Sequence, residues 1–183
     1  HYTDELGLSQ TGAGVLTASY AAGTLVASVP GGLLAGRIGV KPTLLSGLVL
    51  LAVTSLVFAH ASHAAVLDAA RFAQGVGGAL SWAAGLAWLI EVAPDSRRGE
   101  LLGGAISAAI VGVLLGPVLG AAAVELGPAS VFSGVAVLAA CLAAWAALTP
   151  AVAVRRAASS VLTRDLLAKP VLVAVWLVAL PAA

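Results

Sequence analysis

Charge is the scarcest property of this 183-residue chain. Only 9% of its residues are Asp, Glu, Lys or Arg, whereas 61% are hydrophobic. A soluble domain carries about 25% charged residues, because charged side chains help to cover its water-facing surface. With so few charges, most of the surface of this protein must be apolar, which excludes an ordinary water-soluble domain.

Methionine is absent and cysteine occurs once, as Cys141. A single thiol cannot form an intramolecular disulfide, and no cysteine and histidine cluster has the spacing of a metal site. No charged leader with an apolar core and a cleavage site precedes the first long apolar run, so we see no signal peptide. The chain begins with His1 and ends inside an apolar run at Ala183, so we interpret it as a fragment of a longer protein.

The few charges are clustered, and long uncharged runs lie between the clusters. A helix crosses the ~30 Å hydrocarbon core of a bilayer with ~20 residues, so runs of this length predict transmembrane helices. We expect five complete spans, at about 11–36, 42–62, 67–91, 100–124 and 129–149. Residues 1–150 then form one bundle, 151–169 a basic linker, and 170–183 the start of a further helix. The predicted fold is an all-α integral membrane protein with several spans.

The basic residues predict how the chain is oriented. Threading the spans alternately through a membrane places eight of the nine Lys and Arg residues on one side, namely Arg37, Lys41, Arg97, Arg98, Arg155, Arg156, Arg164 and Lys169. An excess of Lys and Arg marks the cytoplasmic side. Residues 1–10 are then extracytoplasmic, and we expect a multi-pass protein of the cell membrane.

Enzymatic and nucleic-acid functions find no support in the sequence. It has no His-Glu-x-x-His pattern, no aspartate pair within a span and no Gly-x-Ser-Gly nucleophile site, so we expect no catalytic residues, cofactor or metal. The basic residues lie in short turns and form no continuous patch for a nucleic acid. A channel or a structural membrane subunit remains as an alternative, although no filter-like motif supports a channel.

Arg71 is the ninth basic residue, and it lies inside the third predicted span. In one interpretation its guanidinium snorkels to the interface or pairs with Asp68, three residues before it. In the other it faces a water-filled cavity, because an ionisable group within a span is a functional hypothesis by default. Gln74 lies one turn further on, close to the same face, and is positioned to share a hydrogen-bond network with Arg71.

Small residues four positions apart recur along the spans. Such residues lie on one helix face and let two backbones approach closely inside a membrane. They are Gly32 and Gly36, Gly75 and Ala79, Gly99 and Gly103, and the series Gly112, Gly116 and Gly120. Pro117 removes a backbone hydrogen bond in the last series, which predicts a bend at a packed and mobile interface.

Three of these motifs, in this order and spacing, resemble those of the major facilitator superfamily of transporters. The turn GLLAGRIGVK at 32–41 resembles the loop between the second and third helices of the family. RFAQGVGGA at 71–79 resembles its fourth-helix signature. GVLLGPVLG at 112–120 resembles a fifth-helix signature associated with proton-coupled antiporters. The resemblance covers nearly the whole chain and implies the N-terminal half of the fold without its first helix.

The resemblance also implies roles for individual residues. Arg71, Gln74 and Gly75 would belong to the site of substrate binding and proton coupling. Residues of the fifth-helix motif would shape the interface between the two halves, and these are Gly112, Gly116, Pro117 and Gly120. Residues of the cytoplasmic gate loop would be Gly32, Arg37, Gly39 and Lys41.

The loop departs from the family pattern at two positions. Gly36 replaces an acidic residue and Val40 replaces a basic one. We therefore hypothesise that Glu91, at the far end of the third span, pairs with Arg37 and takes over the role of the missing acid.

The implied function is secondary active transport by alternating access, with proton-coupled export of small organic molecules or drugs as the first expectation. An uptake permease for sugars or organic acids is the alternative. Its partners would be the lipid bilayer, a small-molecule substrate and protons, with the proton gradient as energy source and the full-length monomer as the functional unit. Arginine stays protonated in proteins, so Arg71 cannot itself carry the proton.

Overall fold

The structure, a computed structural model, describes residues 10–150. Within this range the chain forms five long α-helices and one short 3-10 helix. The long helices are α2 (Gln10–Ile38), α3 (Val40–His60), α4 (Ala64–Val92), α5 (Arg98–Leu126) and α6 (Pro128–Leu148), and the short helix η1 (Asp95–Arg97) joins α4 to α5. The predicted linker at 151–169 and the further helix at 170–183 lie outside the described residues.

All five long helices of the described range are long and apolar enough to cross a membrane. Each covers one of the uncharged runs of the sequence, and the shortest have 21 residues, equivalent to about 30 Å of helix. No strand occurs between residues 10 and 150. The chain is therefore an all-α membrane protein with several spans, as its sequence predicts.

Two of the turns between helices depend on glycine. Gly39 is the single residue between α2 and α3, and its φ of 102° lies where only glycine is unstrained. Gly127, with a φ of 81°, is likewise the single residue between α5 and α6. These turns reverse the chain at once, so α2 runs antiparallel to α3 and α5 to α6.

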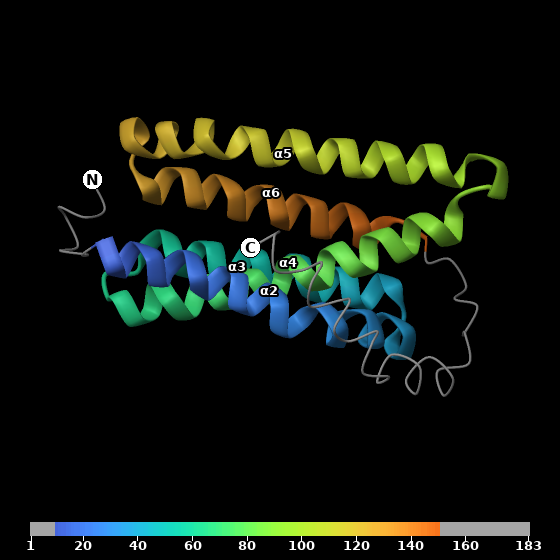
Figure 1. The fold of residues 1–183 in the computed structure, drawn as a ribbon, viewed down its shortest axis with the longest axis horizontal. Coiled ribbons are helices and arrows are strands. Elements are labelled where there is room, and N and C mark those ends of the chain that lie inside the picture. Colours follow the sequence, from blue (N-terminus) through green and yellow to red (C-terminus); the bar gives the residue numbers. More distant parts are fainter. Residues whose placement is uncertain (1–9, 151–183) are drawn as a thin grey trace.

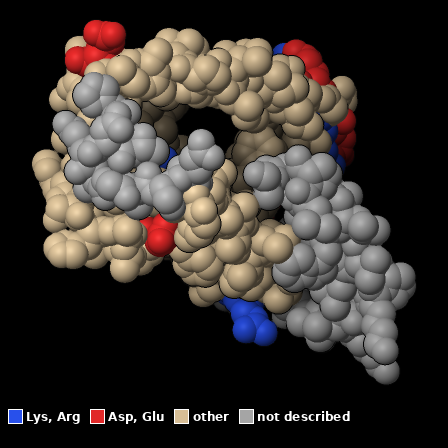
Figure 2. All heavy atoms as spheres, turned by 60° about the vertical axis from the view of Figure 1, so that its left-hand side comes forward, with Lys and Arg blue, Asp and Glu red and all other residues tan. Residues whose placement is uncertain are grey.

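The helices form two groups, shown in Figure 1. The first group contains α2, α3 and α4, and the second contains α5 and α6, which lie side by side above it in this view. Helix α6 packs against α3, whereas α5 meets mainly its neighbour α6. Figure 2 shows the surface hollowed between the layer of α5 and the helices beneath it.

Helix α4 is the centre of the first group, because glycines bring its backbone close to both neighbours. A Cβ added to Gly75 would overlap the carbonyl oxygen of Tyr20 on α2. On another face of α4, a Cβ on Gly77 would lie 2.9 Å from the carbonyl oxygen of Gly47 on α3. The close approach that small residues permit in a membrane is thus made by α4 with α2 and with α3.

The other small-residue pairs do not pack in this way among the described residues. A Cβ on Gly32, Gly36, Gly99 or Gly103 would meet no atom within 4 Å. In α5 no residue is buried, and its helix continues through Pro117 from Arg98 to Leu126. Of the small-residue sets predicted to pack closely, Gly75 and Ala79 are therefore the pair that is buried among the described residues.

Candidate functional site

Arg71 lies deeper in its helix than the sequence suggested. Helix α4 begins at Ala64 rather than near Leu67, so Arg71 is about 10 Å along the helix from its start. Its side chain is partly buried. A permanently charged group at this depth requires polar or aromatic partners, because its transfer out of water is costly.

A short hydrogen-bonded chain connects Arg71 to α3. Arg71 Nη1 donates to Gln74 Oε1 over 3.2 Å, and Gln74 Nε2 donates to Ser55 Oγ over 3.2 Å. Gln74 and Ser55 are buried, with only 4% and 1% of their surface exposed. The predicted sharing of a network by Arg71 and Gln74 is therefore present, and it extends across the interface between α4 and α3.

Two aromatic rings lie against the Arg71 guanidinium. Its Cζ is 4.5 Å from the ring centroid of Phe58 on α3 and 5.2 Å from that of Phe132 on α6. The two ring centroids are 4.4 Å apart and their planes are inclined by 53°. These distances are within the range of cation–π attraction, which strengthens when the cation is removed from water. Arg71 thus joins three helices at one point.

The ion pair proposed between Arg71 and Asp68 is not formed in this structure. Among the described residues, salt bridges join Arg97 to Glu100 and Arg98 to Asp95, and Asp68 takes part in neither. The spacing of three residues permits such a pair on a helix, but it does not require it. Arg71 turns instead toward Gln74 and the two rings.

Gly75 serves the packing of α4, beside the polar network. It is buried, and an added Cβ would lie 2.8 Å from the backbone nitrogen of Thr24. Thr24 Oγ1 also donates to the Gly75 carbonyl oxygen over 3.4 Å. The structure thus places Gly75 on the face of α4 toward α2, while Arg71 and Gln74 reach α3.

The residues of the predicted gate loop lie at the opposite end of the bundle from Arg71. Gly39 forms the turn itself, and Arg37 is exposed in the last turn of α2. Lys41 reaches across to α6, where its Nζ donates to the carbonyl oxygens of Ala147 at 2.8 Å and Thr149 at 2.6 Å. Lys41 therefore binds the C-terminal end of a helix, where unpaired carbonyls and the helix dipole favour a cation.

The hypothesised pair between Glu91 and Arg37 is not formed either. Arg37 is exposed on the surface of the bundle, whereas Oε2 of Glu91 is buried without a hydrogen-bond partner in the described part of the protein. Both residues lie near the same end of the bundle, at the last turns of α2 and α4. Gly32 is exposed, and nothing in residues 10–150 packs on it.

The predicted motif of the fifth helix lies on an open surface. Gly112, Gly116, Pro117 and Gly120 are all exposed on α5. An added Cβ at any of the three glycines would meet no described atom within 4 Å. None of these four residues takes part in the hydrogen bonds and ring contacts described above for Arg71.

Sequence reasoning missed Ser55, Phe58 and Phe132 as neighbours of Arg71. The chain contains only three phenylalanines. Phe58 lies near the C-terminal end of α3, and Phe132 lies near the N-terminal end of α6. Under the alternating topology, these helix ends lie on the same side of the membrane as the start of α4. The sequence could therefore have predicted that both rings lie at the same depth as Arg71, but not that they point toward it.

The arrangement holds a permanent cation inside the bundle, in contact with Gln74 and two aromatic rings. No set of three or more His, Cys, Asp or Glu side chains that could hold a metal ion occurs in the described chain. Cys141 is a free, exposed thiol on α6. A guanidinium stays charged in proteins, so Arg71 can act electrostatically on charges brought near it.

Comparisons with known proteins agree with this architecture. The family profile described as Major Facilitator Superfamily matches residues 1–183. An MFS-type transporter ppzB of Metarhizium rileyi is 36% identical over 122 residues, which are 66% of this chain and 25% of that protein. The human synaptic vesicular amine transporter is 36% identical over 113 residues, 61% of this chain and 22% of that protein.

A bacterial protein gives a similar match. The multidrug resistance protein MdtL of Shewanella oneidensis is 32% identical over 116 residues, 63% of this chain and 29% of that protein. The matched region thus spans about a quarter of the length of each of these relatives. Taken with five apolar helices and the motifs at residues 32–41, 71–79 and 112–120, the family match leads to one conclusion: this chain belongs to the major facilitator superfamily of membrane transporters.

Proposed function

We propose that this chain is part of a proton-coupled exporter of small organic molecules that works by alternating access. The observation that supports it most is the Arg71 network, a polar chain inside a membrane span of a transporter family member. Ionisable groups within spans are costly, and they commonly mark substrate or ion pathways. In alternating access, two bundles move around a site near the midplane, and coupling requires a charge state that differs between conformations.

In this proposal Arg71 influences a proton without carrying it. Its guanidinium stays charged, so it would lower the affinity of a nearby carboxylate for protons and stabilise the ionised form. In the described spans, Asp68, Glu91 and Glu125 all lie near helix ends. We therefore place the proton-binding carboxylate in the part of the full-length protein that residues 10–150 do not include.

The names of the relatives suggest the substrate class. One is an amine transporter and another a multidrug resistance protein. We propose lipophilic organic amines and related cations as substrates of this chain's full-length protein. Such a cation and Arg71 would compete for the same carboxylate, so binding of substrate and release of protons would be coupled through charge.

The open surface of α5 fits the same proposal. Its exposed side chains include Val113, Leu114 and Val118, and no residue of this helix is buried within the described part of the chain. We propose that the second half of the full-length protein covers this face. Gly112, Gly116 and Gly120 would then allow close and movable contact between the halves, and Arg37 and Lys41 would belong to the cytoplasmic gate.

The test is transport by the full-length protein in proteoliposomes, with the fluorescent cation ethidium as probe. We expect a pH gradient to drive ethidium transport, and Arg71→Ala to reduce the initial rate by about tenfold or more. Arg97→Ala is the matched control, because Arg97 is an exposed arginine paired with exposed Glu100. It should transport at the wild-type rate.

Two outcomes would contradict the proposal. If folded Arg71→Ala transports ethidium as the wild type does, Arg71 has no part in coupling. If glucose or citrate is accumulated and ethidium is not moved, the protein is an uptake permease instead. Size-exclusion chromatography in detergent confirms that each variant is folded before its transport is compared.

A further inference from the structure

The two rings beside Arg71 come from helices that are far apart in the sequence. Phe58 lies on α3, Phe132 on α6, and Arg71 on α4 between them. Phe58 is 2% exposed and belongs to a small apolar cluster with Leu67 and Ala70, against which Phe132 also packs. The Arg71 guanidinium therefore contacts both rings at the edge of this apolar cluster.

We propose that Phe58 and Phe132 are positioning residues that hold the charge of Arg71 in one place and orientation. The inference rests on the proposed coupling role of Arg71. An arginine side chain has many rotamers, and the hydrogen bond from Nη1 to Gln74 restrains one edge of the guanidinium. The two rings contact the guanidinium from two other helices, with their centroids 4.5 and 5.2 Å from its Cζ.

This restraint matters because electrostatic coupling depends steeply on distance inside a low-dielectric site. A guanidinium that moves away by a few ångströms loses much of its effect on a neighbouring carboxylate. Aromatic rings attract the cation through their quadrupole and stay neutral themselves. Phe58 and Phe132 thereby position the cation without adding a titratable group to the site.

Simple core packing is the competing explanation for the two rings, and it makes different predictions. Leucine preserves an apolar side chain of useful size but has no π face, whereas tyrosine preserves the face. If the rings only fill space, leucine and tyrosine should behave alike at the half-buried position 132. If they position Arg71, Phe132→Leu should release it and Phe132→Tyr should not.

The first measurement is independent of transport. Phenylglyoxal modifies accessible guanidinium groups, and mass spectrometry resolves the modification at each arginine of the full-length protein. We expect Arg71 to react slowly in the wild type and about five- to tenfold faster in Phe58→Leu and Phe132→Leu. Phe132→Tyr should keep the slow rate. Phe72→Leu is the matched control, since Phe72 is an exposed phenylalanine next to Arg71 in the sequence.

The second measurement separates coupling from folding. In proteoliposomes, Phe132→Leu should lose most of the pH-driven ethidium transport but keep ethidium exchange in the absence of a gradient, and Phe132→Tyr should restore the driven transport. Unchanged phenylglyoxal rates at Arg71 in both leucine variants would overturn the positioning role. Faster phenylglyoxal modification of Arg71 in the leucine variants would support the positioning role. If Arg71→Ala at the same time shows normal pH-driven transport, the coupling role on which the inference rests is refuted.

Discussion

Two cations of this chain show how single residues depend on neighbours distant in sequence. Arg71 lies against Phe58 and Phe132, and Lys41 lies against the last carbonyls of α6. Asp68, the acid that the sequence offered to Arg71, takes part in neither salt bridge of the described residues. Lys41 donates to backbone carbonyls, and the Arg71 guanidinium contacts Gln74 and two aromatic rings.

Lys41 allows a prediction at this scale. Lys41→Ala should destabilise the last turn of α6 by about 1 kcal/mol, because two carbonyls lose a charged donor and the helix end loses a favourable cation. Hydrogen exchange should show faster exchange in the peptide that covers residues 145–149. Lys41→Arg, which retains charge and donors, is the control; equal exchange in the wild type and Lys41→Ala would show that the contact contributes nothing.

At the scale of elements, α4 determines how the first group packs. Its glycines face two different helices, with Gly75 toward α2 and Gly77 toward α3. Both contacts are made with backbone atoms, which cannot rotate away from an added methyl group. The crossing of α4 with its neighbours is therefore fixed by the absence of side chains at these positions.

Replacement of a packed glycine and of an open one on α4 should have opposite effects. Gly75→Ala should destabilise the protein by about 2–3 kcal/mol, because the new Cβ would overlap the Tyr20 carbonyl and force α2 away. Gly85→Ala should be neutral or stabilise by about 0.5–1 kcal/mol through helix propensity, since nothing lies within 4 Å of its added Cβ. Thermal unfolding in detergent compares the two, and equal melting temperatures would refute the packing role of Gly75.

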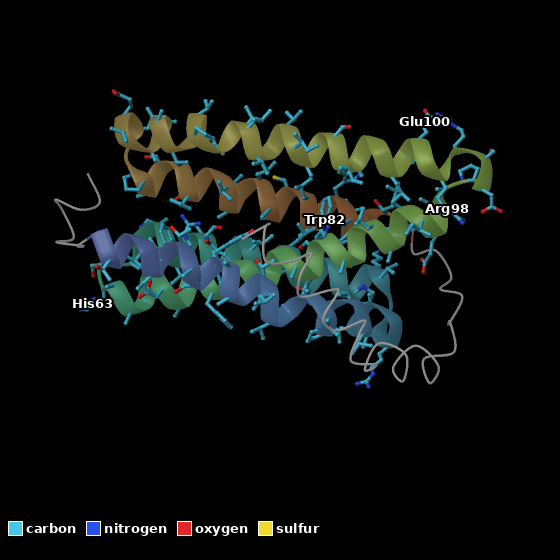
Figure 3. All side chains as sticks on the ribbon, viewed as in Figure 1. His63, Trp82, Arg98 and Glu100 are labelled. Carbon is cyan, nitrogen blue, oxygen red and sulfur yellow. The ribbon has the colours of Figure 1, made fainter. Side chains whose placement is uncertain are left out.

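At the scale of the whole molecule, the turns fall into two sets at opposite ends of the bundle. His63 lies at one end, whereas Arg98 and Glu100 lie at the other (Figure 3). The end with Arg98 also receives the α2–α3 turn with Arg37 and Lys41, because successive helices alternate in direction. Among the described residues, all Lys and Arg side chains except Arg71 therefore belong to one end of the bundle, which we expect to be cytoplasmic.

Cysteine labelling tests this orientation. In a Cys141→Ala background, a membrane-impermeant maleimide should label Ser62→Cys in intact cells and Ser96→Cys only after permeabilisation. Both serines are exposed in turns at opposite ends. The reverse pattern would show that the chain has the opposite orientation, and labelling of both sites in intact cells would refute the alternating topology.

The positions of the helices could be predicted from the sequence because a membrane imposes a simple rule. A helix must satisfy its own backbone hydrogen bonds in lipid, so uncharged runs of sufficient length locate the spans. The prediction of Arg71 and Gln74 as one network followed from their spacing on a helix. The pairing of Arg37 with Glu91 did not follow, since opposite charge alone does not determine where two side chains point.

The sequence by itself determined that this protein spans a membrane, where its helices lie and which family it belongs to, because hydrophobic run length and local motifs are properties of contiguous residues. Only the tertiary structure decided that α4 is central, that Lys41 binds the end of α6, and that Phe58 and Phe132 receive Arg71. These are contacts between residues separated by 13 to 108 positions. They depend on how helices cross and on which face each side chain presents, and no local pattern specifies either.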